Sequence, residues 1–271
     1  MSALIDRHQI CMWCSVIIVS MLFSCTQSEN ASNFQGELFI KMLDSPANLQ
    51  QVNITIDRVS VHREGAATDG GWSYVSTEST GSINLLRLRN GISERIVLSK
   101  IDAGKYDRIK IIFGACTVIE NGIEARMELD PIAQNGRLLS YTFEVVEGKR
   151  TQLTFDFDVS RSVLKNGIIY VFKPIIRVQN TLLSGSILGS VLGPDSLLTS
   201  SSTVMTSTGL DSVSTLTDLV TGSFRLADLP EAVYAISIQS GDPRFRDTVL
   251  TNLTVVRQQE TNVGVIRLRR K

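Results

Sequence analysis

Apolar and polar residues alternate along most of the chain, which is the pattern of half-buried β-strands. The segment 151–178 shows it most clearly. In its first half every second residue is apolar, and a strand would bury these side chains on one face: Leu153, Phe155 and Phe157. Its second half, after Asn166-Gly167, is a near-continuous apolar run. Because Asn-Gly suits the positive φ of a tight hairpin turn, the segment predicts a strand, a turn and a central strand.

A bulge and a set of turns complete the first predicted domain. In the segment 51–64 the apolar positions change parity after Ile56, so we expect a β-bulge or a change of face there. Pro174 cannot donate a ladder hydrogen bond and marks a bulge or the point where a strand leaves its neighbour. The Asn-Gly dipeptide recurs between apolar runs, at positions 90–91, 121–122, 135–136 and 166–167. These features predict an antiparallel, hairpin-rich β domain over residues 36–179.

A second set of alternating segments predicts another β module over residues 185–271. Its apolar runs are expected to form strands at 185–191, 222–226, 229–238, 248–256 and 262–268. A Ser/Thr-rich stretch, 195–218, is predicted to be a longer hairpin with a mobile tip. We therefore expect an all-β chain of two antiparallel β-sandwich-like domains, joined by a short linker at 179–184 and folding separately.

The first residues have the features of an export signal. An apolar core of about 14 residues precedes Ser24-Cys25, shorter than the roughly 20 residues of a membrane-spanning helix. The sequence Leu22-Phe23-Ser24-Cys25 resembles the lipobox of bacterial lipoproteins, in which the cysteine receives diacylglycerol. The resemblance implies a signal peptide at 1–24, lipid on Cys25 and a polar tether at 25–35. It places the protein in the cell envelope, at the outer membrane on its periplasmic or surface face. An ordinary cleaved signal peptide or an uncut helix are the alternatives.

Charge and cysteine content exclude several function classes. The chain has 27 basic and 27 acidic residues and no basic stripe, so nothing indicates a nucleic-acid partner. Removal of the leader, with Cys11 and Cys14, leaves Cys25 and Cys116, so no internal disulfide is expected. Cys116 lies in an apolar context and is predicted to be a buried thiol. His62 would be the single histidine of the mature chain, which excludes zinc sites built on several histidines, and its position predicts an exposed or edge side chain.

Two groups of side chains are candidates for binding. Asp156 and Asp158 share a strand face and are within reach of one cation or of a hydroxylated ligand. Calcium needs about six oxygen ligands, however, so a solvent-facing pair matched by Arg161 or Lys173 is the simpler interpretation. Aromatic residues that would stack on sugar rings, or fill the core and rim of a sandwich, are Trp72, Tyr74, Tyr106, Tyr141 and Tyr170.

Several motifs between Gly36 and Val178 resemble a known bacterial lipoprotein family. The segments LDSPANLQQVNITIDRVSVHREG, GWSYV, INLLRLRNG, IDAGKYDRIKIIFG, LTFDFDVSRSV and YVFKPIIRV are similar to domain of unknown function 4382. Residues from Gly185 onward resemble the carboxypeptidase regulatory-like family, which implies a prealbumin-like β-sandwich. Neither resemblance brings catalytic residues.

Together these features predict a non-enzymatic lipoprotein that binds or scaffolds a partner at the membrane surface. The expected partners are the membrane, through lipid on Cys25, and a polysaccharide or another envelope protein; no cofactor, metal or catalytic residue is predicted. A carbohydrate-binding protein is the alternative, which an exposed coplanar aromatic pair would favour. An enzyme is the least favoured hypothesis, since it would need a pocket with perturbed carboxylates.

Overall fold

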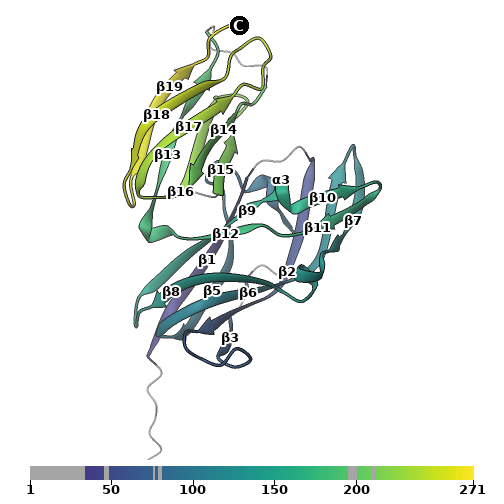
Figure 1. Ribbon diagram of the computed structural model, residues 1–271, viewed down its shortest axis with the longest axis vertical. Helices are drawn as coiled ribbons and strands as arrows, with labels where there is room; N and C mark the ends of the chain where they lie inside the picture. Colours follow the sequence, from purple (N-terminus) through teal and green to yellow (C-terminus); the bar gives the residue numbers. More distant parts are fainter. Residues whose placement is uncertain (1–33, 46–48, 76, 79–80, 195–199, 209–210) are drawn as a thin grey trace, which may run out of the picture. The chain divides into compact units, whose positions relative to one another are not determined.

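β-Strands make up nearly all of the regular structure in the computed structural model (Figure 1), which describes residues 34–45, 49–75, 77–78, 81–194, 200–208 and 211–271. The predicted signal peptide, the tether up to residue 33 and Cys25 lie outside these residues. Within the described ranges, no helix is both long and apolar enough to cross a membrane.

The first module consists of the strands from β1 to β12. They run as β1 (Gln35–Ser45), β2 (Gln51–Arg63), β3 (Trp72–Val75), β4 (Ile83–Asn84), β5 (Glu94–Asp102), β6 (Gly104–Glu120), β7 (Ile123–Leu129), β8 (Arg137–Val145), β9 (Arg150–Asp158), β10 (Val163–Asn166), β11 (Ile169–Phe172) and β12 (Ile176–Asn180). One sheet has the order β12-β9-β1-β5. The larger sheet has the order β10-β11-β7-β6-β2-β3, with β4 paired to β2 and β8 paired to β6.

One hydrophobic core holds this module together, and its residues come from both sheets. The alternation in β9 acts as predicted, since its three apolar side chains are fully buried: Leu153, Phe155 and Phe157. In β2 the buried positions change parity after Ile56, and Val59 and Val61 are then fully buried. The β2–β6 register shifts at this place, so the predicted bulge is confirmed.

The segment 151–178 is divided between the two sheets. β9 pairs with β1 and β12, whereas the Asn166-Gly167 turn joins β10 to β11 in the other sheet. The chain passes from one sheet to the other around Pro174, which agrees with the prediction that a strand leaves its neighbour at this proline. The prediction of one central strand was wrong, because the apolar run is split and β12 lies at a sheet edge. Ile168, the first residue of the apolar run, is 93% exposed at the tip of the β10–β11 hairpin.

Short helices and turns connect the strands. The helical segments are η1 (Leu85–Arg87), α2 (Pro131–Gln134), α3 (Val159–Ser162) and η2 (Thr181–Leu183). Of the Asn-Gly dipeptides, the second and fourth close hairpins, β6–β7 and β10–β11. The first lies between η1 and β5, and the third follows α2. Most neighbouring strands of this module are antiparallel, but β1–β9 and β7–β11 are parallel.

The second module has two sheets around its own hydrophobic core. Figure 1 shows its strands in green to yellow, and they run as β13 (Ser184–Leu192), β14 (Thr203–Thr208), β15 (Asp211–Leu216), β16 (Ser223–Pro230), β17 (Ala232–Gln239), β18 (Thr248–Val255) and β19 (Glu260–Arg267). Their orders are β16-β13-β19 and β15-β14-β17-β18. The Ser/Thr-rich stretch contains the β14–β15 hairpin, whose tip lies outside the described residues. η2 occupies the stretch predicted as a linker.

Candidate functional site

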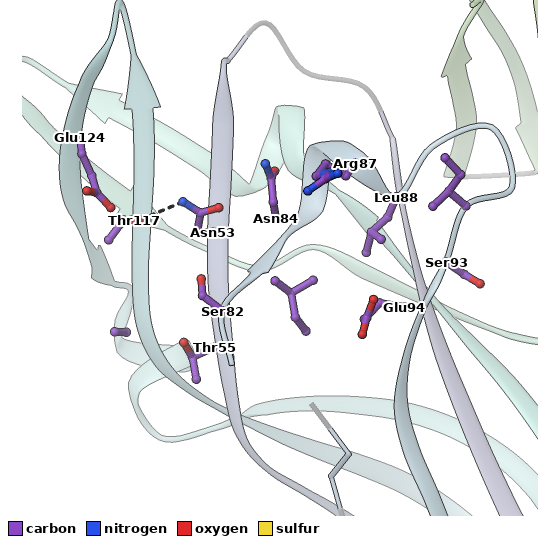
Figure 2. Close-up of a pocket in the computed structure, with 13 residues that line it drawn as sticks. Asn53, Thr55, Ser82, Asn84, Arg87, Leu88, Ser93, Glu94, Thr117 and Glu124 are labelled. Carbon is purple, nitrogen blue, oxygen red and sulfur yellow. Dashed lines mark hydrogen bonds between the residues drawn. The ribbon is translucent and has the colours of Figure 1, made fainter. Parts of the chain in front are cut away.

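A pocket with a volume of about 790 Å³ opens on the larger sheet of the first module (Figure 2). We call it the polar pocket, because most of its lining side chains carry hydroxyl, amide or charged groups. Its lining residues are Asn53, Thr55, Ser82, Ile83, Asn84, Arg87, Leu88, Ile92, Ser93, Glu94, Ala115, Thr117 and Glu124. They come from β2, from the segment 82–88 around β4 and η1, from residues 92–94 at the entry to β5, and from β6 and β7.

The floor of the polar pocket is the sheet face that points away from the core. Val52 and Ile54 are fully buried, so the alternation of β2 turns Asn53 to the opposite side. In the strand register Asn53 stands between Thr117 on β6 and Asn84 on β4. Asn53 Nδ2 donates a hydrogen bond of 3.3 Å to Thr117 Oγ1, as Figure 2 shows. A row of polar side chains therefore crosses three adjacent strands.

A β-bulge shapes the next row of the floor. Ile54 pairs with Cys116 and Ile56 with Phe113, so Thr55 alone faces two residues of β6. One of those two is Ala115, which lines the pocket together with Thr55. Bulges re-aim side chains and are common next to binding sites. Because of this bulge, the small side chain of Ala115 lies in the pocket lining next to the polar row.

The β4–η1 segment forms a wall. Asn84 Oδ1 accepts a hydrogen bond of 3.1 Å from the Leu86 backbone N–H and so caps η1. Leu85 and Leu88 are buried in the core and anchor the turn, which leaves Arg87 exposed beside the pocket.

Charged groups stand around the mouth of the polar pocket. Arg87, Glu94 and Glu124 belong to its lining and are exposed. Among the residues that the structure describes, none of these three takes part in an ion pair. The mouth therefore presents one cation and two carboxylates to a ligand.

Cys116 is adjacent in sequence to two lining residues of the pocket, but its thiol is unsuited to catalysis. Cys116 lies between the lining residues Ala115 and Thr117 on β6, but it points into the core and is 1% exposed. Burial raises the pKa of its thiol to about 11, with a smaller contribution in the same direction from the charge of Asp57. The thiolate is the reactive form of cysteine, so this thiol is a weak nucleophile at neutral pH. The prediction of a buried thiol is confirmed.

Comparison with protein families matches residues 35–174 to "Domain of unknown function (DUF4382)". The match spans more than half of the chain and includes every residue that lines the polar pocket. The chain belongs to this family. No curated protein matches the chain.

Several solved structures show a distant likeness to this DUF4382 protein, and two of those described next are pilins. The TIE protein of Bacillus anthracis is 9% identical, with a TM-score of 0.28; 99% of this chain covers 45% of that one, so this chain spans about half its length. GBS52, a minor pilin of Streptococcus agalactiae, is 11% identical with a TM-score of 0.25, over 87% of this chain and 96% of the pilin. BcpA, the major pilin of Bacillus cereus, is 11% identical with a TM-score of 0.24, over 88% and 71%. Likeness at this level carries no argument about what the DUF4382 protein binds.

The two aspartates singled out from the sequence do not form an open pair. The prediction that Asp156 faces solvent was wrong: it is 9% exposed, and Arg177 Nη2 lies 2.6 Å from its Oδ2. Arg177 lies opposite Asp156 on β12, which pairs with β9, and the sequence did not predict this pairing. Burial raises the pKa of the Asp156 carboxyl, while the charge and hydrogen bond of Arg177 act to lower it.

Asp158 has a structural role at the start of α3. Its Oδ1 accepts hydrogen bonds from the Arg161 backbone N–H at 3.1 Å and from Ser160 Oγ at 2.7 Å. The Arg161 guanidinium lies 3.6 Å from its other oxygen, so the expected match with Arg161 is confirmed. In the described part of the DUF4382 protein, no group of three or more His, Cys, Asp or Glu side chains is placed to hold a metal ion.

His62 is fully buried, so the prediction of an exposed or edge histidine was wrong. β2 is an interior strand at this position, where His62 pairs with Trp72 on one side and Arg108 on the other. Its Nδ1 lies 2.7 Å from Asp107 Oδ1, and its Nε2 lies 3.0 Å from the Ala67 carbonyl oxygen. The hydrogen bond with His62 holds the pKa of the Asp107 carboxyl below its usual range.

The aromatic residues do not supply a sugar-stacking platform in the described part of the chain. Tyr106 and Tyr170 are buried, and Tyr106 stacks on Phe143 inside the core. Tyr74 is 58% exposed, but its ring faces the Arg58 guanidinium rather than a second ring. The observation that would have favoured carbohydrate binding through aromatic stacking is therefore missing from these residues.

The polar pocket was not predicted from the sequence. Two signals were present: the polar residues between apolar ones in β2, and Asn84 in front of a helical turn, where asparagine is a favoured cap. Neither signal shows which strands lie beside β2, and the pocket depends on that pairing.

Proposed function

We propose that this DUF4382 protein is a non-enzymatic lipoprotein of the bacterial cell envelope, held at the outer membrane by lipid on Cys25. Its first module acts as the binding or scaffolding part, at the periplasmic or surface face. The apolar segment of about 14 residues that ends at Ser24-Cys25 supports the anchor.

The observation that carries the binding role is the polar pocket. Its lining provides amides, hydroxyls and exposed charges, which fix a ligand by hydrogen bonds. The groups that a nucleophilic mechanism would use are engaged elsewhere. Cys116 faces the core with a raised pKa, and His62 is enclosed between Asp107 and the Ala67 carbonyl. Binding without chemistry therefore accounts for the site with fewer assumptions than catalysis.

Lipid on Cys25 would be sufficient for stable membrane attachment. Two acyl chains of about 16 carbons bury roughly 28 methylenes, and each contributes about 0.8 kcal/mol. One such chain alone gives only reversible binding, whereas two hold a protein to a bilayer.

The experiment compares the parent protein with Cys25→Ala in cells fed radiolabelled palmitate. The parent should incorporate label and sediment with membranes, and Cys25→Ala should lose both properties. Cys14→Ala is the matched control, because it removes a cysteine from the discarded apolar segment and should leave labelling unchanged. A parent without label, or a Cys25→Ala variant that still sediments with membranes, would refute the anchor.

A further inference from the structure

We propose that the polar pocket binds a neutral saccharide of about two sugar units and recognises it by its hydroxyl groups. This inference rests on the proposed function, since it takes the first module to be a binding domain. The ligand class follows from the side chains that line the pocket and not from aromatic stacking.

The floor of the pocket calls for a ligand that donates and accepts hydrogen bonds at closely spaced positions. Asn53 donates to Thr117, and its carbonyl oxygen Oδ1 has no partner among the described residues. Thr55 and Ser82 add hydroxyl groups, each of which donates and accepts. A sugar hydroxyl has the same double capacity, so a ring with neighbouring hydroxyls matches this row of side chains.

The strand pairing of the floor disfavours an extended peptide bound along the floor by strand addition. An extended peptide is commonly bound by adding to the free edge of a sheet, where main-chain hydrogen bonds supply affinity. β2 and β6, which form the floor, are interior strands with neighbours on both sides. At Asn53 the ladder of β2 continues to β4, and at Thr117 the ladder of β6 continues to β7. The floor therefore offers side chains only.

The charges around the mouth disfavour an ionic ligand. Arg87 contributes +1 and the two carboxylates, Glu94 and Glu124, contribute −2, so the lining has a net charge of −1. A phosphate or a polyanion would meet this negative excess, whereas a cation would meet Arg87. A neutral ligand can donate hydroxyl hydrogens to the carboxylates and accept from the guanidinium, which makes use of all three groups.

The size and the apolar contacts of the pocket fit a disaccharide. A volume of about 790 Å³ lies within the usual range of ligand sites, which is roughly 300–1,000 Å³. Ile92, which is 60% exposed, and Ala115 give the lining small apolar surfaces. These suit the C–H groups of a sugar ring, so recognition falls on the hydroxyl edge with limited apolar contact.

The test measures binding by titration calorimetry and by ligand-observed NMR. It uses the full-length protein purified in a detergent without a sugar headgroup, whichever cell fraction contains it. The probes are maltose, N,N′-diacetylchitobiose, trialanine and inorganic phosphate. At least one disaccharide should bind saturably with a Kd of about 1 mM or tighter, and trialanine and phosphate should not.

Two variants locate the binding. Thr55→Val keeps the side-chain shape and removes one hydroxyl, so it should weaken disaccharide binding about three- to tenfold. Arg87→Gln changes an exposed side chain with little risk to folding and should weaken binding about tenfold or more. Thr251→Val is the matched control, because Thr251 is exposed on β18 in the second module.

Three results would overturn the proposal. The first is that neither disaccharide binds at a concentration of about 10 mM, which is about ten times the expected Kd. The others are that trialanine or phosphate binds as well as the sugars, or that the two pocket variants bind the sugars as well as the control variant does. Each variant should unfold at the same Tm as the parent protein, which shows that a loss of binding does not come from a loss of fold. The binding readout does not depend on lipid, and palmitate labelling does not depend on the pocket. Failure of the saccharide inference and failure of the anchor are therefore distinguishable.

Discussion

Replacing Arg177 by Met should strongly destabilise the first module, because the change leaves the Asp156 carboxylate buried without its cation. The guanidinium Nη2 lies 2.6 Å from Asp156 Oδ2, and the two side chains are 12% and 11% exposed. Methionine retains most of the apolar stem of arginine, so the substitution removes the charge and its hydrogen bonds with little change in packing.

The size of the effect follows from the burial of the pair. Removing one partner of a buried ion pair costs about 3–5 kcal/mol, since the remaining charge is left without compensation. For a protein of this length each kcal/mol lowers the Tm by about 2–4 °C. We therefore expect Arg177→Met to unfold about 10 °C below the parent at pH 7.

The effect should also depend on pH in a defined direction. Burial raises the pKa of Asp156, and Arg177 opposes that rise, so the variant raises it further. A carboxyl whose pKa is higher in the folded state favours folding when it is protonated, and this advantage is lost as pH rises through the folded-state pKa. The deficit of Arg177→Met should thus shrink as pH falls from 8 to 5, by up to about 1.4 kcal/mol per pH unit.

Urea unfolding followed by tryptophan fluorescence measures these free energies, because Trp72 lies in the first module. The double variant Asp156→Asn, Arg177→Met removes both charges and should recover much of the loss. Arg161→Met is the matched control: its guanidinium is 59% exposed beside Asp158, so it should cost at most about 1 kcal/mol. The reasoning is refuted if Arg177→Met costs no more than this control at pH 7, or if its deficit is the same at pH 5 and pH 8.

Two further outcomes follow from the same geometry. Millimolar calcium should shift the Tm of the protein by less than about 2 °C, because Asp156 is paired with Arg177 and Asp158 caps α3; occupancy of a site at one hundred times its Kd would add about 2.7 kcal/mol. A larger shift that disappears in Asp156→Asn, Asp158→Asn would contradict this. Cys116 should react with Ellman's reagent at pH 8 only after unfolding in guanidinium, since burial raises its thiol pKa to about 11. Rapid labelling of the folded protein, absent in Cys116→Ala, would show that the thiol is accessible.

Local alternation predicted the faces of many strands but not their neighbours. The apolar residues of β9 and the change of parity in β2 were predicted correctly, because period-two burial is a property of one strand and its core. The partner of each strand is set by contacts between distant segments. β1 and β9 are parallel neighbours although about a hundred residues separate them, and no local signal indicates this.

The same limit explains the errors at single residues. Asp156 looked solvent-facing because it alternates with Phe155 and Phe157, yet β12 places Arg177 beside it. His62 followed an apolar run and looked like a strand end, but β3 and β6 flank it on both sides. In both cases the sequence indicated a polar face, and tertiary contacts covered that face with a charged or hydrogen-bonding partner.

The polar pocket depends on the direction of its side chains, which the sequence predicts, and on the pairing of its strands, which the sequence does not predict. The outward direction of Asn53 and Thr55 follows from Val52, Ile54 and Ile56, whose alternation is visible in the sequence. The row that Asn53 forms with its neighbours on β4 and β6 depends on register, and Ala115 lies opposite Thr55 because of a bulge. A slip of one residue in either pairing would turn these side chains to the other face. A polar strand face therefore becomes part of a pocket only through its pairing, so substitutions in the polar pocket test this pairing as well as the proposed ligand.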